Sequence, residues 1–475
     1  MLFNSLAFAV FLPIVFILYW AVPHKFRWPV LLVSSYYFYM SWNPEYVILI
    51  FLTTVVSYGA ALGIERAKKK RTKRWILLLA LGVCLGILFT FKYFNFFSAS
   101  VTSLLSLFAI RLSPVTVNLL LPVGISFYTF QTLSYVIDVY RGDVPAERNL
   151  GVYAAFVSFF PQLVAGPIER TGNLLPQIAS EKTFDQAKAS YGLKLMAWGF
   201  FKKLAVADVL GSYVDAAYGS LSACTGFDLL TAIVFFTIQI YCDFSGYSDI
   251  AVGTAKLLGI DLMTNFKSPY FSLSIKEFWS RWHISLSTWF RDYVYIPLGG
   301  NRRGSLKRDR NLLLTFLVSG LWHGASWTYV VWGGIHGMAQ ILENRFSRGN
   351  RGRRGGFPLL RWLGVFAFCN AAWVFFRAES LADAWYVLSQ AVFSLAHPAS
   401  LLPGVTGLEL KDLCFILLSM ALVAGFDYLS LKRDVIAWVS RMPPPIRWSC
   451  YLALVWLTLC LMLPSGSSEF VYFQF

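Results

Sequence analysis

The chain is 475 residues long, with 57% hydrophobic, 17% aromatic and only 14% charged residues. Soluble domains carry roughly 25% charged residues, so this composition excludes an ordinary soluble enzyme and favours a polytopic membrane protein. The net charge of +16 indicates membrane topology and not nucleic-acid binding, because the cations gather in short loops between apolar runs. The alternation typical of a membrane β-barrel is absent from the sequence, which therefore predicts one all-α domain over residues 1–475.

The first apolar runs predict the orientation of the amino terminus. Residues 2–22, 28–40 and 46–64 are expected to span the membrane, and the basic loops HKFR and ERAKKKRTKR follow the first and third runs. The positive-inside rule places both loops in the cytoplasm and the N-terminus outside. No A-x-A-like site follows the first run, so it is expected to be an anchor and not a cleaved signal peptide.

The next runs are less regular. Residues 75–91 predict a fourth span and residues 96–110 a shorter one. Proline, glycine and polar residues interrupt the apolar runs at 118–140 and 159–168. We interpret the first interruption as a broken or bent helix against a cavity and the second as a re-entrant segment, since irregular backbone at membrane depth survives only when it is buried in protein or faces water.

Cysteine and histidine spacing excludes the common metal motifs. The seven cysteines are scattered without a C-x-x-C pair, which indicates packing residues and no disulfide framework. The five histidines include no H-E-x-x-H motif, so no metal site is predicted. Asp243 and Asp249 follow the apolar run 229–241, where a cavity-lining or capping role is favoured over catalysis.

Residues 278–300, FWSRWHISLSTWFRDYVYIPLGG, are too polar for a simple span and too aromatic for a simple loop. They are expected to line a cavity or an interface, where tryptophan and tyrosine rings are favoured. The basic stretch 301–310, NRRGSLKRDR, follows. Its charge favours a cytoplasmic loop, with phosphate binding as the alternative.

The run 312–337 carries Trp322-His323-Gly324 within apolar sequence. An ionisable side chain at membrane depth is a functional candidate by default, and the alternative is a core histidine that only hydrogen-bonds a neighbouring helix. His336 lies thirteen residues further on. On one continuous helix the two rings would point to nearly opposite sides, so they are not expected to act as a pair.

Two of these segments, FWSRWHISLSTWFRDYVYIPLGGNR and SGLWHGASWTYVVWGGIHG, resemble the signature of the membrane-bound O-acyltransferase family. The opening MLFNSLAFAVFLPIVFILYW, FFPQLVAGPIER, YCDFSGYSDIA, WVFFRAES and the ending FVYFQF are similar to its bacterial branch that acts in alginate O-acetylation. The resemblance implies a ring of roughly eleven or more helices, with re-entrant or interfacial helices, around a central funnel. It places the family's histidine at His323 and its second polar residue at His283.

The resemblance implies acyl transfer from a thioester to a hydroxyl, for which His323 would be the base. His283 would orient His323, stabilise the oxyanion or hold the acceptor, and an acyl-histidine is conceivable but not required. The predicted substrate and tunnel residues are Trp322, Ser319, Trp282, Arg281, Arg291 and Asp292. No bound cofactor is expected, and the implied donor is acetyl-CoA. Its predicted phosphate-binding residues are Arg302, Arg303, Lys307 and Arg308.

The expected partners are membrane lipid and a separate exported SGNH-type acetyltransferase. An exopolysaccharide is the expected acceptor, and it is reached indirectly. The polymer stays open among alginate, cellulose, peptidoglycan and other glycans. His323 follows the basic loop by about twelve residues, or roughly 18 Å of helix, which places it near mid-membrane. The rival hypothesis is a transporter or flippase for a lipid-linked or free sugar with His323 in a proton relay. A third is a scaffold without chemistry.

Overall fold

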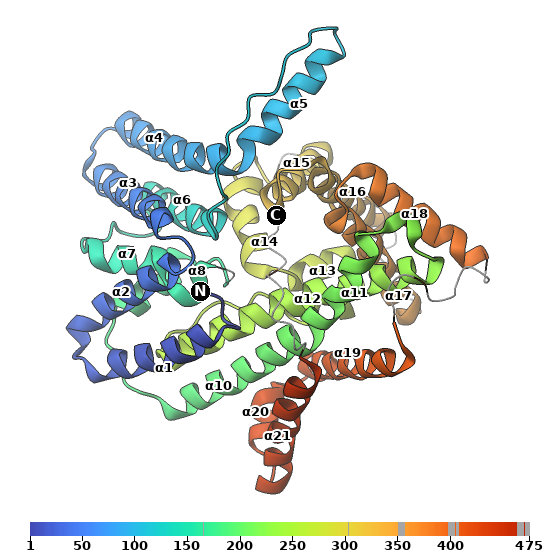
Figure 1. The fold of residues 1–475 in the computed structure, drawn as a ribbon. Helices are drawn as coiled ribbons and strands as arrows, with labels where there is room; N and C mark the ends of the chain where they lie inside the picture. Colours follow the sequence, from blue (N-terminus) through green and yellow to red (C-terminus); the bar gives the residue numbers. More distant parts are fainter. Residues whose placement is uncertain are drawn as a thin grey trace. The chain divides into compact units, whose positions relative to one another are not determined.

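The computed structural model describes residues 1–164, 166–302, 304–349, 357–397, 404, 408–462 and 470. Every regular element among these residues is a helix, from α1 to α21 with short 3-10 and π-helical segments (Figure 1). The all-α prediction is therefore confirmed. Contacts divide the chain into two compact units, unit 1 with residues 1–193 and 250–263 and unit 2 with residues 194–249 and 264–475. The single domain over 1–475 stays a prediction.

Apolar length identifies the helices that can cross a membrane. Among the described residues, six helical stretches are long and apolar enough: Pro44–Arg66, Lys70–Ser106, Gly226–Leu257, Pro358–Arg377, Lys411–Ser430 and Pro444–Leu461. Two shorter apolar stretches are Leu6–Ala21 and Leu150–Leu163. The chain is thus a polytopic helical membrane protein, while the count of eleven or more helices stays an expectation.

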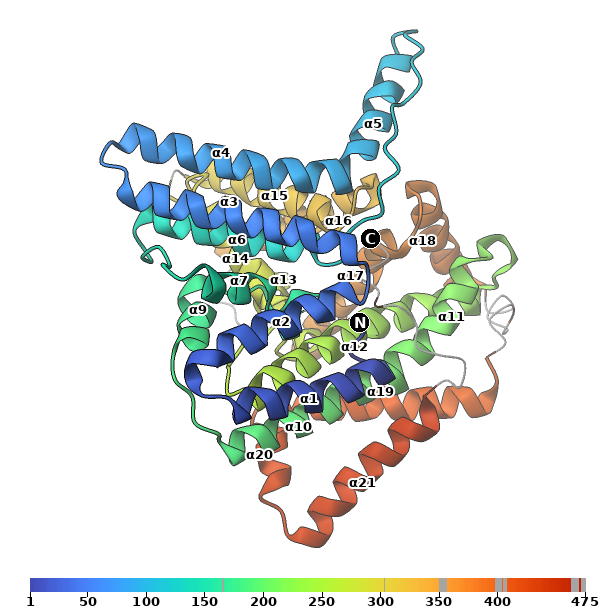
Figure 2. The same cartoon turned by 60° about the vertical axis from the view of Figure 1, so that its left-hand side comes forward.

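Unit 1 holds the amino-terminal helices. They are α1 (Leu6–Ala21), α2 (Arg27–Met40), α3 (Val47–Arg66), α4 (Lys70–Leu88), α5 (Phe94–Ser106), α6 (Ile125–Arg141), α7 (Leu150–Ser158), α8 (Phe160–Leu163) and α9 (Thr171–Ala179), and α10 (Gln186–Phe200) begins there. In both views α3, α4 and α6 pack side by side, and α5 projects beyond the end of α4 (Figures 1 and 2). The predicted spans at 2–22, 28–40, 46–64 and 75–91 all fall on helices.

The broken or bent helix predicted over 118–140 begins only at Ile125, and α6 then runs without a break to Arg141, while the cavity beside it stays a prediction. Gly124 has a φ of +75°, and a Cβ there would lie 2.6 Å from the Leu163 carbonyl oxygen, so α6 begins only after a turn that glycine can make. Inside the unit, the Gln162 amide donates to Gln131 Oε1 at 2.8 Å, and Gln131 donates to the Phe156 carbonyl at 2.8 Å. These buried amides connect α6 with α7 and α8.

Unit 2 holds the remaining helices, except that residues 250–257 at the end of α12 belong to unit 1. After α10 and the π-helical segment η4 (Phe201–Ala207) come α11 (Asp208–Tyr218), α12 (Gly226–Leu257), α13 (Ile275–Arg281), α14 (Ile284–Phe290), the π-helical η7 (Arg291–Tyr295), α15 (Ser305–His323), α16 (Trp327–Gly349), α17 (Pro358–Arg377), α18 (Leu381–Ala396), α19 (Leu410–Ser430), α20 (Val435–Ser440) and α21 (Pro444–Leu461). α15 and α16 lie side by side in both views (Figures 1 and 2).

A buried ionic cluster joins η4 to the middle of α12. Lys203 Nζ lies 2.8 Å from both Asp208 Oδ1 and Asp243 Oδ1, with all three side chains at most 4% exposed. Lys202 Nζ lies 2.7 Å from Asp249 Oδ2. Asp243 and Asp249 sit within α12 and not at its end. The capping role considered from the sequence is therefore wrong, because both carboxylates pair with lysines of a neighbouring segment.

Candidate functional site

The turn between α13 and α14 places His283. Trp282 ends α13 in an extended conformation, and His283 precedes α14 with φ +41° and ψ +55°. Few residues other than glycine adopt this left-handed region, although histidine is enriched there. Within the predicted cavity-lining segment 278–300, the short helices α13 and α14 therefore meet at a turn that contains His283. The imidazole of His283 is fully buried.

His323 ends α15, and the chain reverses directly after it. A Cβ at Gly324 would lie 2.2 Å from the Tyr329 ring, and one at Gly320 would lie 2.2 Å from the Tyr329 carbonyl oxygen. Glycine at these positions lets α16 pack closely on α15. The single helix expected over 312–337 is wrong, because the chain breaks between His323 and Trp327.

The two candidate histidines come together at the inner ends of α14 and α15. Their ring centroids lie 6.5 Å apart, and His323 is 3% exposed. An imidazole with bonds near 1.35 Å has a radius of about 1.2 Å, so the nearest ring nitrogens are at least about 4 Å apart. That separation is beyond a direct hydrogen bond. The two imidazoles are therefore neighbours that do not hydrogen-bond each other directly.

His336 lies apart from this pair and has contacts of its own. The Trp279 indole N–H donates to His336 Nδ1 at 3.2 Å. The Trp332 ring separates His323 and His336, with centroid distances of 5.1 and 5.0 Å. The helix assumed for the His323–His336 geometry was wrong, but the two imidazoles still do not meet, because an indole lies between them.

A pocket of about 640 Å³ runs along α14 and α15. On α14 and η7 its lining residues repeat at helical spacing: Leu286, Ser287, Phe290 and Arg291. On α15 they do the same: Arg308, Leu312, Thr315, Phe316 and Ser319. Residues three or four apart share one helix face, so the α14 stripe points back to His283 and the α15 stripe points on to His323. The pocket thus leads toward the histidine pair from the Arg291 and Arg308 end.

The outer end of this pocket is electropositive. Lys276, Arg291 and Arg308 line it, and no carboxylate is among its described lining residues. Asp309 lies beside it and is 2.6 Å from Arg308. Burial alone would raise the pKa of Asp309, but the guanidinium groups of Arg308 and Arg345 outweigh it and hold that pKa below its usual value. Asp309 therefore stays ionised and fixes Arg308 at the pocket mouth.

The other predicted site residues take varied positions. Ser319, Arg291 and Arg308 line the pocket. Trp282 and Trp322 are buried, at 1% and 4% exposure. Their rings, like those of His283, belong to an aromatic cluster in unit 2.

The remaining charged candidates lie outside the lining of this pocket. Arg281 pairs with Glu277 at 2.6 Å, and Asp292 pairs with Arg291 at 2.7 Å. Arg302 and Lys307 are exposed, and Arg303 lies outside the described residues. The roles assigned to these residues stay predictions.

Three pocket residues lie outside every segment singled out from the sequence: Lys276, Gln340 and Asn344. Trp279 also lines the pocket and belongs to the predicted cavity-lining segment 278–300. Lys276 and Trp279 are three apart on α13, and Gln340 and Asn344 are four apart on α16, so each pair shares one helix face. That spacing was the signal available in the sequence. It shows that two residues share a helix face, but it does not show which helices pack against that face. Only the packing of α13 and α16 around α14 and α15 makes these faces part of the site. Among the described residues, no group of three or more His, Cys, Asp or Glu side chains could hold a metal.

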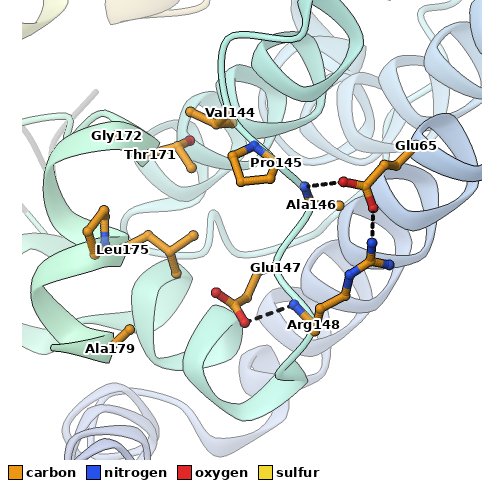
Figure 3. Close-up of a pocket in the computed structure, with 11 residues that line it drawn as sticks. Glu65, Val144, Pro145, Ala146, Glu147, Arg148, Thr171, Gly172, Leu175 and Ala179 are labelled. Carbon is orange, nitrogen blue, oxygen red and sulfur yellow. Dashed lines mark hydrogen bonds and ion pairs between the residues drawn. The ribbon is translucent and has the colours of Figure 1, made fainter.

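Unit 1 has a pocket of its own, of about 420 Å³, between the end of α3, residues 144–148 and the start of α9 (Figure 3). Glu65 accepts a hydrogen bond from the Ala146 backbone N–H at 3.3 Å and pairs with Arg148. Leu175 and other apolar side chains form most of the remaining wall (Figure 3). The Glu65 carboxylate thus ties the end of α3 to the loop after α6. The pocket contains none of the predicted site residues.

A helical membrane protein with a cationic pocket that leads toward two buried histidines fits an enzyme that transfers a group at membrane depth. Comparison with known proteins gives the class: residues 147–382 match the membrane-bound O-acyltransferase family. Full-length relatives show the same relationship, and the chain belongs to this family. It is an O-acyltransferase and a multi-pass membrane protein.

The curated relatives carry several acyltransferase names. The chain is 40% identical to a probable alginate O-acetylase of Pseudomonas putida, over 100% of both chains. It is 35% identical to a peptidoglycan O-acetyltransferase of Helicobacter pylori, over 84% of this chain and 81% of the relative. It is 30% identical to a teichoic acid D-alanyltransferase of Streptococcus thermophilus, over 61% and 77%.

Proposed function

We propose that this enzyme takes an acetyl group from cytoplasmic acetyl-CoA and passes it across a bacterial plasma membrane for O-acetylation of a periplasmic or extracellular polysaccharide. The main support is the pocket whose two helical stripes lead from cations to the two histidines. The names of the alginate and peptidoglycan relatives support an acetyl group and a polysaccharide acceptor. Family membership favours this function over the transporter and scaffold hypotheses. The N-terminus is proposed to lie outside.

In the proposed reaction, His323 removes the proton of an acceptor hydroxyl, or of water when no acceptor is present, as its oxygen attacks the thioester carbonyl. The new C–O bond of the acetyl product forms, the C–S bond breaks, and the CoA thiolate leaves. A positioned imidazole suits this role near neutral pH. The gap of at least about 4 Å between the nearest ring nitrogens argues against His283 orienting His323 directly. We propose that His283 contacts the reacting group and stabilises the oxyanion. No acyl-histidine is needed for this sequence of steps.

The proposed donor fits the pocket by charge and shape. Its phosphates would meet Lys276, Arg291 and Arg308, while its thioester arm would follow the α15 stripe inward. From Arg308 to His323 the helix rises roughly 22 Å. An extended donor arm is therefore needed to carry a thioester from the cationic end to the histidines, and a bare acetyl group would not bridge the two. The segments near Gly124 and Gly166, predicted as tunnel walls, stay a prediction.

Neutralising the pocket cations is expected to weaken donor binding. Lys276→Gln combined with Arg291→Gln removes two positive charges, and charge-assisted hydrogen bonds contribute about 1.5–3 kcal/mol each. We expect KM for acetyl-CoA to rise at least about tenfold, since 1.4 kcal/mol is tenfold in affinity. Initial rates of labelled acetyl-CoA turnover by the purified enzyme measure this effect.

The matched control is Lys432→Gln combined with Arg441→Gln, an exposed lysine and arginine of the same unit. It removes the same charge and should leave KM within about twofold of the wild-type value. A third variant, Arg302→Gln with Lys307→Gln, tests the loop cations predicted from the sequence. If the loop variant raises KM and the pocket variant does not, the donor is bound by the loop and the pocket proposal is wrong.

We also propose a separate exported acetyltransferase of the SGNH type as the partner that acts on the polymer. No helix-free stretch among the described residues is longer than 107–124, which is too short for a polymer-binding domain. Purified enzyme with labelled acetyl-CoA should turn over the thioester but leave added polysaccharide almost unlabelled. Adding the exported partner should restore labelling. Efficient polymer labelling by this chain alone would overturn the partner proposal.

A further inference from the structure

Residues 265–267 form backbone hydrogen bonds with the residues on both sides of the turn that contains His283. The Ile284 backbone N–H donates to the Asn265 carbonyl oxygen at 2.9 Å, and the Lys267 backbone N–H donates to the Arg281 carbonyl oxygen at 3.0 Å. These bonds flank the α13–α14 turn on both sides. The residues after α12 therefore act as a backbone template for the turn that carries His283.

The Asn265 side chain adds two further hydrogen bonds. The Ser285 hydroxyl donates to Asn265 Oδ1 at 2.6 Å, and the Asn265 amide donates to Ser248 Oγ on α12 at 2.8 Å. Asn265, Ser248 and Ser285 are each at most 3% exposed. One asparagine thus connects α12 to the first turn of α14, directly after the histidine.

The same two segments enclose the imidazole itself. Phe244, one turn before Ser248 on α12, meets the His283 ring edge-on at a centroid distance of 4.6 Å. Phe266, next to Asn265, lies 6.4 Å from it. Fixing α12 and Asn265 to α14 therefore fixes the aromatic walls and the backbone of His283 together.

We propose that Asn265 is a positioning residue that holds His283 in its left-handed conformation and so keeps the imidazole beside His323. A non-glycine residue in this region of φ and ψ persists only when its surroundings over-determine it. Asn265 supplies three of the bonds that do so, through its carbonyl, its Oδ1 and its amide. This inference rests on the proposed role of His283 in acyl transfer.

Asn265→Ala removes both side-chain bonds and leaves the pocket cations in place. We expect kcat for acyl transfer to fall at least about tenfold with KM for acetyl-CoA within about twofold, because a misplacement of 1 Å can reduce the rate by about a hundredfold. A loss of folded protein alone would lower the active fraction without changing a spectroscopic probe of His283. The enzyme labelled with ¹³C in its five histidines provides that probe, with His283 assigned by its loss in His283→Ala.

The matched control is Asn370→Ala, another buried asparagine, whose Oδ1 accepts the Thr237 hydroxyl at 2.9 Å. We expect Asn265→Ala to shift the His283 resonance and Asn370→Ala to leave both resonance and kcat unchanged. If Asn265→Ala does not fold, Ser285→Ala takes its place, because it removes only the bond to Oδ1. Wild-type kcat with an unshifted resonance in a folded variant overturns the proposal, and so does an equal shift in Asn370→Ala.

The outcome for His283→Ala separates this inference from the proposed function. If His283→Ala is inactive and Asn265→Ala has wild-type kcat, Asn265 does not position the histidine, and the catalytic proposal stands. If His283→Ala keeps full activity, the catalytic role of His283 fails. In that case the His283 resonance in Asn265→Ala still decides whether the asparagine sets its conformation.

Discussion

Replacing His323 by glutamine is expected to lower the rate of acyl transfer by a factor of ~100 to 10,000, the range that a positioned general base contributes. Glutamine keeps a polar side chain at the end of α15 but cannot take up the hydroxyl proton. The loss should appear in kcat, since the pocket cations that are proposed to bind the donor are untouched. Turnover of labelled acetyl-CoA by purified enzyme measures it, with size-exclusion chromatography as the test of folding.

His397→Ala is the control for this prediction, because it removes an exposed histidine beyond the end of α18. It should leave kcat unchanged. Full acyl transfer by a folded His323→Gln variant would exclude His323 as the base. Loss of sugar transport without loss of acyl transfer would instead support the transporter hypothesis.

Lys203→Met is expected to destabilise unit 2 by about 3–5 kcal/mol, the cost of removing one partner from a buried ion pair. Lys203 is 1% exposed and contacts Asp208 and Asp243, whose carboxylates would lose the ammonium that they share. Methionine preserves much of the volume, so the effect comes from charge and not from a cavity. A fall in the apparent melting temperature of the detergent-solubilised protein measures it.

Two further variants test this explanation. Lys188→Met removes a lysine whose partner, Asp261, is 55% exposed, and it should cost no more than about 1 kcal/mol. Adding Asp243→Asn to Lys203→Met should recover part of the lost stability, because it removes one of the unpaired charges. A wild-type melting temperature for Lys203→Met would mean that the cluster does not stabilise the fold.

The ion pairs of the buried lysines could not be predicted from the sequence. Asp243 and Asp249 stood out because two carboxylates follow an apolar run, and this signal correctly marked an unusual position. Their partners Lys202 and Lys203 lie some forty residues earlier, and no local pattern links the two segments. The capping role was wrong because a carboxylate after an apolar run does not show where the helix ends. A buried cation can stabilise the carboxylate in the middle of the helix.

The histidines show the same division. The tryptophan- and histidine-containing motifs singled out His283 and His323 as the residues to examine, and the polar-aromatic composition of residues 278–300 predicted a cavity wall. The continuous helix over 312–337 was wrong because its composition is apolar throughout, and hydrophobicity does not distinguish one long helix from two packed ones. The close approach of α16 at Gly320 and Gly324 distinguishes them.

The sequence by itself determined the all-α membrane fold, the family and a short list of ionisable candidate residues. These features depend on composition, on the length of apolar runs and on local motifs, all of which can be read from a segment without knowing its neighbours in the fold. Only the tertiary structure decided that His283 and His323 lie side by side, that Trp332 lies between His323 and His336, and that Lys276 joins the cationic pocket mouth. Each of these depends on which helix faces pack together, and helical periodicity defines a face without specifying its neighbour.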